Sequence, residues 1–192
     1  MIIPGIRYNN SYREMNIFIV GMMGSGKSRV GALLSRKLRW EFVDTDEQIE
    51  QKAGMSIARI FELEGEPAFR SMENEVILEL SKKNNLVVAT GGGAACSEVN
   101  RAAFKKNGIT LYLKGSAQTL FARAKKSPPG LRPLLSGNAM SPERIAAILA
   151  DRKKFYEEAD ITIDTDEKTP EELAGAAHAL IIKNFHSTKP AN

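Results

Sequence analysis

Eight residues near the start of the chain have the spacing of a phosphate-binding loop. Residues 21–28 are Gly-Met-Met-Gly-Ser-Gly-Lys-Ser, one glycine followed after four residues by Gly-Lys-Ser. Glycines let backbone N–H groups approach a phosphate closely, while Lys27 can reach the outer phosphates and the Ser28 hydroxyl can join a Mg²⁺ shell. An apolar run over 17–20 precedes the loop and a helical pattern follows it. Because a strand, a glycine-rich loop and a helix N-terminus occur in this order, we predict a nucleoside triphosphate site rather than a plain turn.

Two Asp-Thr-Asp runs, at 44–46 and 164–166, are candidates for the acid that such sites need. The first lies one helix after the loop, at the end of the next strand, where ligands of open α/β sheets bind. On extended chain, Asp44 and Asp46 would point to the same side. We predict that Asp44 supports Mg²⁺ through water together with Ser28, and that Asp46 meets an acceptor hydroxyl as a base or positioning group. The alternative for Asp46 is a helix N-cap.

A second group of residues could bind an acceptor. Arg70 and Glu73 are three apart on an expected helix, so they form either a surface pair of little energy or a held guanidinium that grips a carboxylate. The pair alone favours the surface interpretation. Three glycines, 91–93, end an apolar strand, which indicates either close approach of a ligand or a simple turn. Arg132 lies in a loop after Pro128-Pro129-Gly130 and could act as a lid arginine over the phosphates.

The elements that must position these residues alternate between strands and helices. Expected strands cover 17–20, 41–44, 86–89, 109–113 and 161–163, and expected helices cover 47–53, 57–62, 67–83, 97–106, 117–125, 142–158 and the stretch from 169. This order predicts a parallel sheet covered on both faces. We predict a flexible extension over 1–14, with Met15 as a possible true start, one domain over 15–186 with a lid at about 126–139, and a tail over 187–192.

Composition excludes several other classes of protein. The 192 residues are 43% hydrophobic and 26% charged, as in ordinary globular domains, and no apolar run approaches the roughly 20 residues of a membrane span. The net charge of +4 comes from scattered basic residues, without the dense basic face of a nucleic-acid-binding protein. The single cysteine, Cys96, rules out an internal disulfide. We expect a cytoplasmic monomer that binds neither nucleic acid nor membrane.

Taken together, the motifs resemble those of the shikimate kinase family. The resemblance covers Met15 to about Phe185 and rests on motifs in the family's order: the loop at 21–28, Asp-Thr-Asp at 44–46, Phe-Arg-Ser-Met-Glu at 69–73, the glycines at 91–93, Arg-Pro-Leu-Leu at 132–135, and Arg152 before Tyr-Glu-Glu-Ala-Asp at 156–160. It implies a three-layer α/β/α fold of the P-loop, nucleoside-monophosphate-kinase-like class, with a central five-stranded parallel sheet and a mobile lid. It also implies transfer of the γ-phosphoryl group of ATP, with Mg²⁺, to the 3-hydroxyl of shikimate in the chorismate pathway.

The resemblance also implies a role for each matching residue. Asp46 would orient the hydroxyl, and Asp44 and Ser28 would act on Mg²⁺. Those expected to bind the shikimate carboxylate or line its pocket are Arg70, Gly92, Gly93 and Arg152. Those expected at the nucleotide are Gly24, Ser25, Gly26, Lys27, Ser28, Arg29, Arg123 and Arg132, and the catalytic set would be Lys27, Asp46 and Arg132.

One departure and two alternatives stay open. Arg29 stands where the family usually has threonine, and it either points outward or adds a cation near the nucleotide. The first alternative is another small-molecule P-loop kinase, such as a gluconate-type kinase, and the second is a nucleotide-binding relative without catalysis. A protein kinase is disfavoured because the chain has no His-Arg-Asp or Asp-Phe-Gly element.

Overall fold

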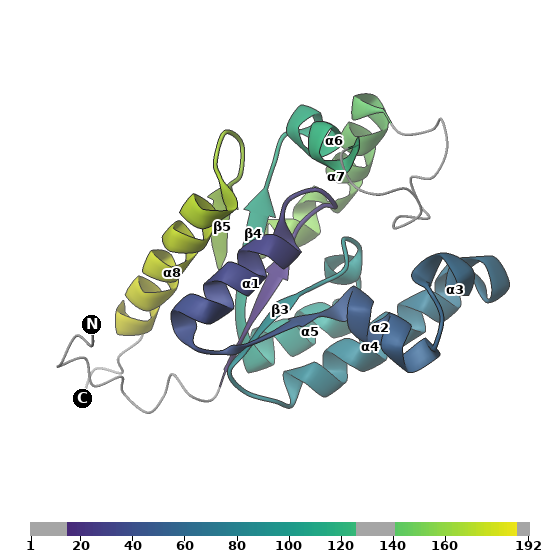
Figure 1. The fold of residues 1–192 in the computed structure, drawn as a ribbon, viewed down its shortest axis with the longest axis horizontal. Helices are drawn as coiled ribbons and strands as arrows, with labels where there is room; N and C mark the ends of the chain where they lie inside the picture. Colours follow the sequence, from purple (N-terminus) through teal and green to yellow (C-terminus); the bar gives the residue numbers. More distant parts are fainter. Residues whose placement is uncertain (1–14, 126–140, 188–192) are drawn as a thin grey trace.

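Five parallel strands form the centre of the molecule (Figure 1). A computed structural model describes residues 15–125 and 141–187. The strands are β1 (Asn16–Val20), β2 (Glu41–Asp44), β3 (Leu86–Ala89), β4 (Gly108–Lys114) and β5 (Ile161–Asp164), in the order β2-β3-β1-β4-β5. The predicted five-stranded parallel sheet is confirmed.

The helices lie close to the predicted ranges. They are α1 (Lys27–Leu38), α2 (Thr45–Ala53), α3 (Ile57–Leu63), α4 (Gly65–Ser81), α5 (Glu98–Asn107), α6 (Ala117–Lys125), α7 (Pro142–Tyr156) and α8 (Pro170–Ser187), with a 3₁₀ turn η2 (Ala94–Cys96). Two differences concern the site: α2 begins at Thr45, two residues earlier than predicted, and η2 was not predicted. None of the helices in the described ranges is long and apolar enough to cross a membrane.

Alternating side chains of β1 supply the two halves of the core. Ile17 and Ile19 pack with buried residues of α1 and α8, whereas Phe18 and Val20 belong to the cluster formed with α4 and α5. Figure 1 shows α1 and α8 on one side of the sheet and α4 and α5 on the other. Because both faces are covered, the inner strands β1 and β3 are buried along their whole length, whereas the edge strand β5 alternates between buried and exposed residues.

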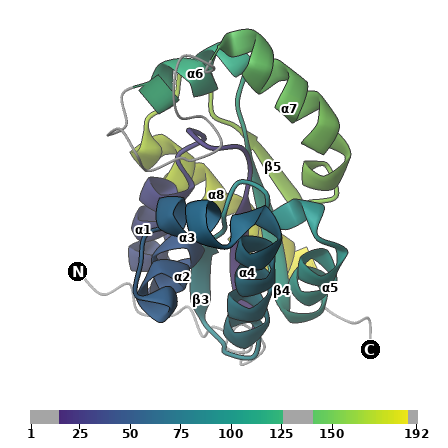
Figure 2. The same ribbon diagram turned by 90° about the vertical axis from the view of Figure 1, so that its right-hand side faces the viewer.

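Helices α6 and α7 lie beyond the carboxyl ends of the strands, at the top of Figure 2. They pack against the rest of the domain through a small apolar cluster of Met22, Leu120 and Ile145. Met22 belongs to the glycine-rich loop, so this cluster joins the loop to both helices. Residues 126–140 connect α6 to α7, so Arg132 and the predicted lid lie outside the described residues.

Asn16, at the start of β1, ties the end of α4 to the start of β3. Its side chain is fully buried, with Nδ2 donating to Lys83 O at 2.8 Å and Oδ1 accepting from Leu86 N at 3.0 Å.

Asn16→Ala should lower the free energy of unfolding by about 3 kcal/mol, because it removes the partners of two main-chain groups. Denaturant titration would measure this. Asn107→Ala, which removes one hydrogen bond to Ala103 O within α5, should cost about 1 kcal/mol or less, and equal losses would contradict the prediction.

Candidate active site

A cleft of about 490 Å³ opens at the carboxyl edge of the sheet. Its walls come from the glycine-rich loop, the ends of β2 and β3, and helices α1, α2, α3, α4, α6, α7 and α8. All the described residues to which the sequence analysis gave a binding or catalytic role line this one cleft: Gly24, Ser25, Gly26, Lys27, Ser28, Arg29, Asp44, Asp46, Arg70, Gly92, Gly93, Arg123 and Arg152.

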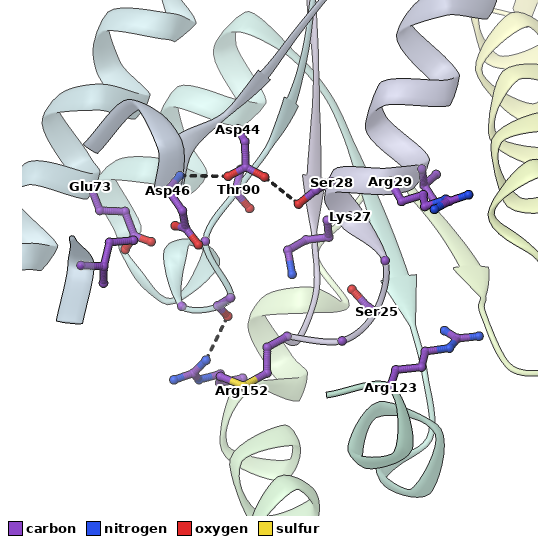
Figure 3. A pocket seen from close by; sticks show the side chains of 18 of the residues that line it. Ser25, Lys27, Ser28, Arg29, Asp44, Asp46, Glu73, Thr90, Arg123 and Arg152 are labelled. Carbon is purple, nitrogen blue, oxygen red and sulfur yellow. Dashed lines mark hydrogen bonds between the residues drawn. The ribbon is translucent and has the colours of Figure 1, made fainter. Parts of the chain in front are cut away.

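The glycine-rich loop turns sharply into α1. Gly24 (φ 79°) and Gly26 (φ 92°) have left-handed backbone conformations that favour glycine, and a Cβ at Gly24 would lie 2.8 Å from Leu120 O. No side chain caps the N-terminus of α1, which leaves its first N–H groups for an anion to accept. Lys27 Nζ donates to Gly21 O at 2.8 Å and Met22 O at 3.0 Å, so the ammonium lies along the loop (Figure 3). This is the geometry of a phosphate cradle.

The aspartates of the first Asp-Thr-Asp run have different positions. Asp44 ends β2, where its Oδ2 accepts from Ser28 Oγ at 2.6 Å and its Oδ1 accepts from Asp46 N at 3.0 Å (Figure 3). Asp44 is therefore the N-cap of α2, and the alternative that Asp46 is the N-cap is wrong. The assumption of extended chain is also wrong, since Asp46 belongs to the first turn of α2. Both carboxylates nevertheless line the cleft.

The Asp46 carboxylate lies in a confined and mostly acidic setting. Its Oδ1 is buried and has no hydrogen-bond partner among the described residues. Burial, followed by the negative charges of Asp44 and Glu73, raises the pKa of Asp46 to about 6, and Lys27 opposes this rise. A carboxylate with an unfilled, buried acceptor oxygen is suited to receive a hydrogen bond from a ligand hydroxyl.

Arg70 and Glu73 do not form the surface pair that their spacing alone favoured. Glu73 is 1% exposed, and its Oε2 accepts from Arg70 Nη1 at 2.7 Å. Burial raises the pKa of Glu73, and the charge of Arg70 opposes the rise. Glu66, which the sequence reasoning missed, adds a second ion pair at 2.9 Å from Arg70 Nη2. Its position four residues before Arg70 was the available signal. Two acids therefore hold one guanidinium at the cleft wall.

Gly91 and Gly93 pack so closely against these groups that a side chain at either position would displace a neighbour. Gly91 N donates to the buried Thr45 Oγ1 at 2.9 Å. A Cβ at Gly91 would overlap Glu73 Oε1 and lie 3.0 Å from Asp46 Oδ1. A Cβ at Gly93 would lie 2.7 Å from both terminal nitrogens of Arg70. The run thus brings backbone against the charged groups of the cleft, which a simple turn would not require.

Gly93→Ala should displace the Arg70 guanidinium while leaving the backbone unstrained. The Gly93 φ of −102° is open to alanine, so only the new methyl group matters. We expect the KM for an acceptor carboxylate to rise about tenfold, with little change in the KM for ATP, because a small displacement of a binding group is costly. Gly175→Ala is the matched control, since a Cβ there meets nothing within 4 Å. Equal effects of both changes on steady-state kinetics would refute this prediction.

Helix α7 contacts the glycine run through two side chains. Arg152 Nη1 donates to Gly92 O at 2.9 Å, and Tyr156 OH donates to the same oxygen (Figure 3 shows the Arg152 bond). Burial raises the pKa of Tyr156 to about 12, so the phenol keeps its proton. Arg152 is therefore anchored at the cleft by its bond to the glycine run. Tyr156 belongs to the motif at 156–160, but its bond to Gly92 was not predicted.

The opposite end of the cleft carries the other basic residues. Arg123 donates to Thr165 O at 2.7 Å and to Thr165 Oγ1 at 3.1 Å. Arg29 points away from the loop toward α8, where Glu171 lies 3.9 Å away, and its side chain is 74% exposed (Figure 3). Of the two alternatives for Arg29, an outward orientation or a cation near the nucleotide, this position favours the outward orientation. The second Asp-Thr-Asp run does not line the cleft; Asp166 instead accepts from Ser116 N.

Comparison with known proteins agrees with this geometry. Residues 23–181 match the family model for shikimate kinase. A shikimate kinase of Legionella pneumophila (strain Corby) is 43% identical over 160 residues, which are 83% of this chain and 90% of that protein. The structure of shikimate kinase from Acinetobacter baumannii in complex with shikimate superposes with a TM-score of 0.83 at 39% identity, covering 89% of this chain and 94% of that one.

A more distant structure separates fold from family. A gluconokinase from Sinorhizobium meliloti superposes with a TM-score of 0.56 at 18% identity, covering 92% of this chain and 98% of that one. That likeness shows a shared fold alone. The family model and the identity to shikimate kinases extend over most of the sequence. The chain therefore belongs to the shikimate kinase family.

Proposed function

We propose that this protein transfers the γ-phosphoryl group of ATP to the 3-hydroxyl of shikimate. Family membership supports the reaction class, and the A. baumannii relative was solved with shikimate bound. The observation that carries the proposal is the pairing of two sites in one cleft. A phosphate cradle lies at one end, and two anchored guanidinium groups flank a glycine run near a buried carboxylate at the other.

The nucleotide would bind along the glycine-rich loop, from Gly24 to Ser28, and α1 would direct its N-terminus at the phosphates. Ser25 Oγ is buried without a hydrogen-bond partner among the described residues, which suits a polar ligand at the loop. Arg123 is proposed to lie near the adenine. Arg29 is proposed to act only from the rim, because it is exposed.

The residues present fit a Mg²⁺ ion. Within residues 15–125 and 141–187 there is no cluster of three or more acidic, histidine or cysteine side chains that could hold a metal. Mg²⁺ in kinases needs no such cluster, since it keeps several waters and binds one or two protein oxygens plus the phosphates. Ser28 Oγ would offer one such oxygen beside the loop, and Asp44, which accepts its hydrogen bond, would support the ion through water. When bound there, the ion would offset phosphate charge.

The acceptor would lie between α4, α7 and the glycine run. Arg70 and Arg152 carry the positive charge that a carboxylate needs, and Gly92 and Gly93 let it approach the main chain. Asp46 Oδ1 and Glu73 Oε1 are buried without partners, so hydroxyl groups would satisfy them. An acid bearing several hydroxyl groups, such as shikimate, matches this set of charges and acceptors.

The chain's own residues would act mainly by positioning and charge stabilisation. Asp46 would orient the attacking hydroxyl and accept its proton, while Lys27 would turn from the loop carbonyls to the transferring phosphoryl group. The role of Arg132 as a lid arginine stays a prediction, as do the monomeric state and the cytoplasmic location.

The test is acceptor-dependent ADP release from MgATP. Shikimate should stimulate release, whereas quinate and gluconate should give little or none. Lys27→Met serves as the control for contaminating kinases, since it should abolish the activity without changing the fold. Stimulation by gluconate instead of shikimate would show that the acceptor is a different hydroxy acid. ATP binding without stimulation by any of the three acceptors would indicate a relative without catalysis.

A further inference from the structure

Two side chains of helix α5 donate hydrogen bonds to the carbonyl groups of η2, the 3₁₀ turn that follows the glycine run. Asn100 Nδ2 donates to Ala94 O at 3.0 Å. Arg101 Nη1 donates to Ala95 O at 2.8 Å and to Cys96 O at 3.0 Å. Every carbonyl of η2 therefore accepts from one of two consecutive side chains in the first turn of α5.

The same Arg101 guanidinium also contacts the end of α7. Its Nε lies 3.2 Å from Glu158 Oε2, just beyond the helix, and its Cζ lies 4.6 Å from the centre of the Phe155 ring. The Arg101 side chain is only 20% exposed. A planar guanidinium has five donors in a fixed arrangement, so it can serve two carbonyls and a carboxylate together, which a lysine ammonium cannot do with the same geometry.

These contacts attach α7 to the glycine segment at two places. Before η2, Gly92 O accepts from Arg152 and Tyr156 of α7. After Gly93, Arg101 joins η2 to Phe155 and Glu158. Gly92 and Arg152, which line the cleft, form the first attachment, and the Arg101 contacts form the second one beside it.

We propose that Arg101 is a positioning residue of the acceptor site. By clamping η2 to the end of α7, it fixes the glycine run and Arg152 relative to each other, so that both meet the acceptor carboxylate. The inference rests on the proposed function for the identity of that acceptor, but the clamp itself can be tested without it. Arg101 itself does not line the cleft and touches no reacting group.

Arg101→Met keeps an unbranched apolar side chain and removes the guanidinium that makes the clamp. The KM for shikimate should rise about tenfold, since small displacements of binding groups have effects of this order. The values of kcat and of the KM for ATP should stay within about threefold, because Asp46 and the glycine-rich loop are held by other contacts. Arg101→Lys should recover part of the shikimate KM, since one ammonium can replace some of the donors.

The single cysteine gives a readout that needs no substrate. Cys96 lies in η2, is half-buried, and burial raises the pKa of its thiol, so it should react slowly with iodoacetamide. Loosening of η2 in Arg101→Met should increase the alkylation rate about fivefold or more, because exposure and thiolate formation both become easier. Intact-mass measurement over time reports this rate for one site only.

Lys105→Met is the matched control. Lys105 lies one turn further along α5 and lines the same hollow near Phe155 and Glu158, so its replacement removes one positive charge while keeping the clamp. It should leave both KM values and the Cys96 rate near those of the unmodified chain. Circular dichroism and thermal unfolding would show whether each variant is folded.

Four outcomes decide the proposal. A raised shikimate KM with a faster Cys96 reaction, both absent in Lys105→Met, supports it. An unchanged shikimate KM overturns it. A lower kcat together with similar increases in the KM for shikimate and the KM for ATP, and with reduced thermal stability, also overturns it, because this would mean a general structural role. If the unmodified chain did not use shikimate, the proposed function would fail and the Cys96 rate would decide the clamp alone: an increase supports it, and no change overturns it.

Discussion

Asp46→Asn should reduce kcat by about 10²–10⁴-fold, the usual contribution of a positioned acid or base. The carboxylate has one buried oxygen without a partner at the cleft, and an asparagine amide can neither take up a proton from the acceptor hydroxyl nor carry the charge. The KM for ATP should change little, because the loop contacts of Lys27 and the Ser28–Asp44 bond remain. Steady-state kinetics with both substrates would measure these values.

The same variant should not lose stability at neutral pH. Burial and neighbouring acids raise the pKa of Asp46 from 3.8 to about 6, so the folded state disfavours its charged form. A raised pKa means that the wild-type chain loses stability as the pH increases through this range, and asparagine removes that loss. Asp46→Asn should therefore unfold at an equal or higher denaturant concentration at pH 7, and the difference should vanish well below pH 4.

Asp164→Asn is the control for Asp46→Asn. It changes an acid of the other Asp-Thr-Asp run, which lies outside the cleft and caps its own turn by accepting from Asp166 N. Activity close to wild type is expected. A kcat for Asp46→Asn within threefold of wild type would remove Asp46 from the catalytic assignment.

Arg70→Ala should raise the KM for shikimate about 10²-fold, since charge-assisted hydrogen bonds contribute about 1.5–3 kcal/mol each. The KM for ATP should stay within a few fold, because Arg70 lies on the acceptor side of the cleft. The change also leaves Glu73 buried without its cation, which costs about 3–5 kcal/mol of stability. Arg70→Lys keeps the charge without the two-pronged guanidinium, so it should still raise the shikimate KM while preserving the fold.

Arg59→Ala is the matched control for Arg70→Ala. Arg59 and Glu62 form the same i,i+3 pair at 2.7 Å, but on α3 and with 51% and 67% of the side chains exposed. Its loss should change stability by less than about 1 kcal/mol and leave both KM values unaltered. Similar increases in the KM for shikimate and the KM for ATP in Arg70→Ala would show that Arg70 does not bind the acceptor specifically.

Much of the fold and site could be predicted from local patterns. The strand over 86–89 and the helix over 117–125 were predicted with the bounds that the structure has, because apolar runs and breakers mark them directly. The glycine-rich loop was equally plain, since its spacing, strand and helix are contiguous. Such features depend on nearest neighbours along the chain.

What the sequence left open depends on packing between distant elements. The burial of Glu73 follows from what α4 packs against, which i,i+3 spacing does not reveal. Asp44 is the N-cap because α2 begins directly after β2. Local sequence does not determine the first residue of a helix to within one or two positions, so this could not be predicted. The bond from Tyr156 to Gly92 and the contacts of Arg101 join segments dozens of residues apart, so no local pattern could predict them.

The central claim is that the acceptor is shikimate and that its 3-hydroxyl receives the phosphoryl group. Phosphorus NMR of a reaction with MgATP and shikimate tests this directly. The account predicts one new phosphomonoester signal, coupled to the proton on carbon 3 of shikimate and formed in equal amount to ADP. ADP with inorganic phosphate and no ester, or an ester on a different hydroxyl, would contradict it.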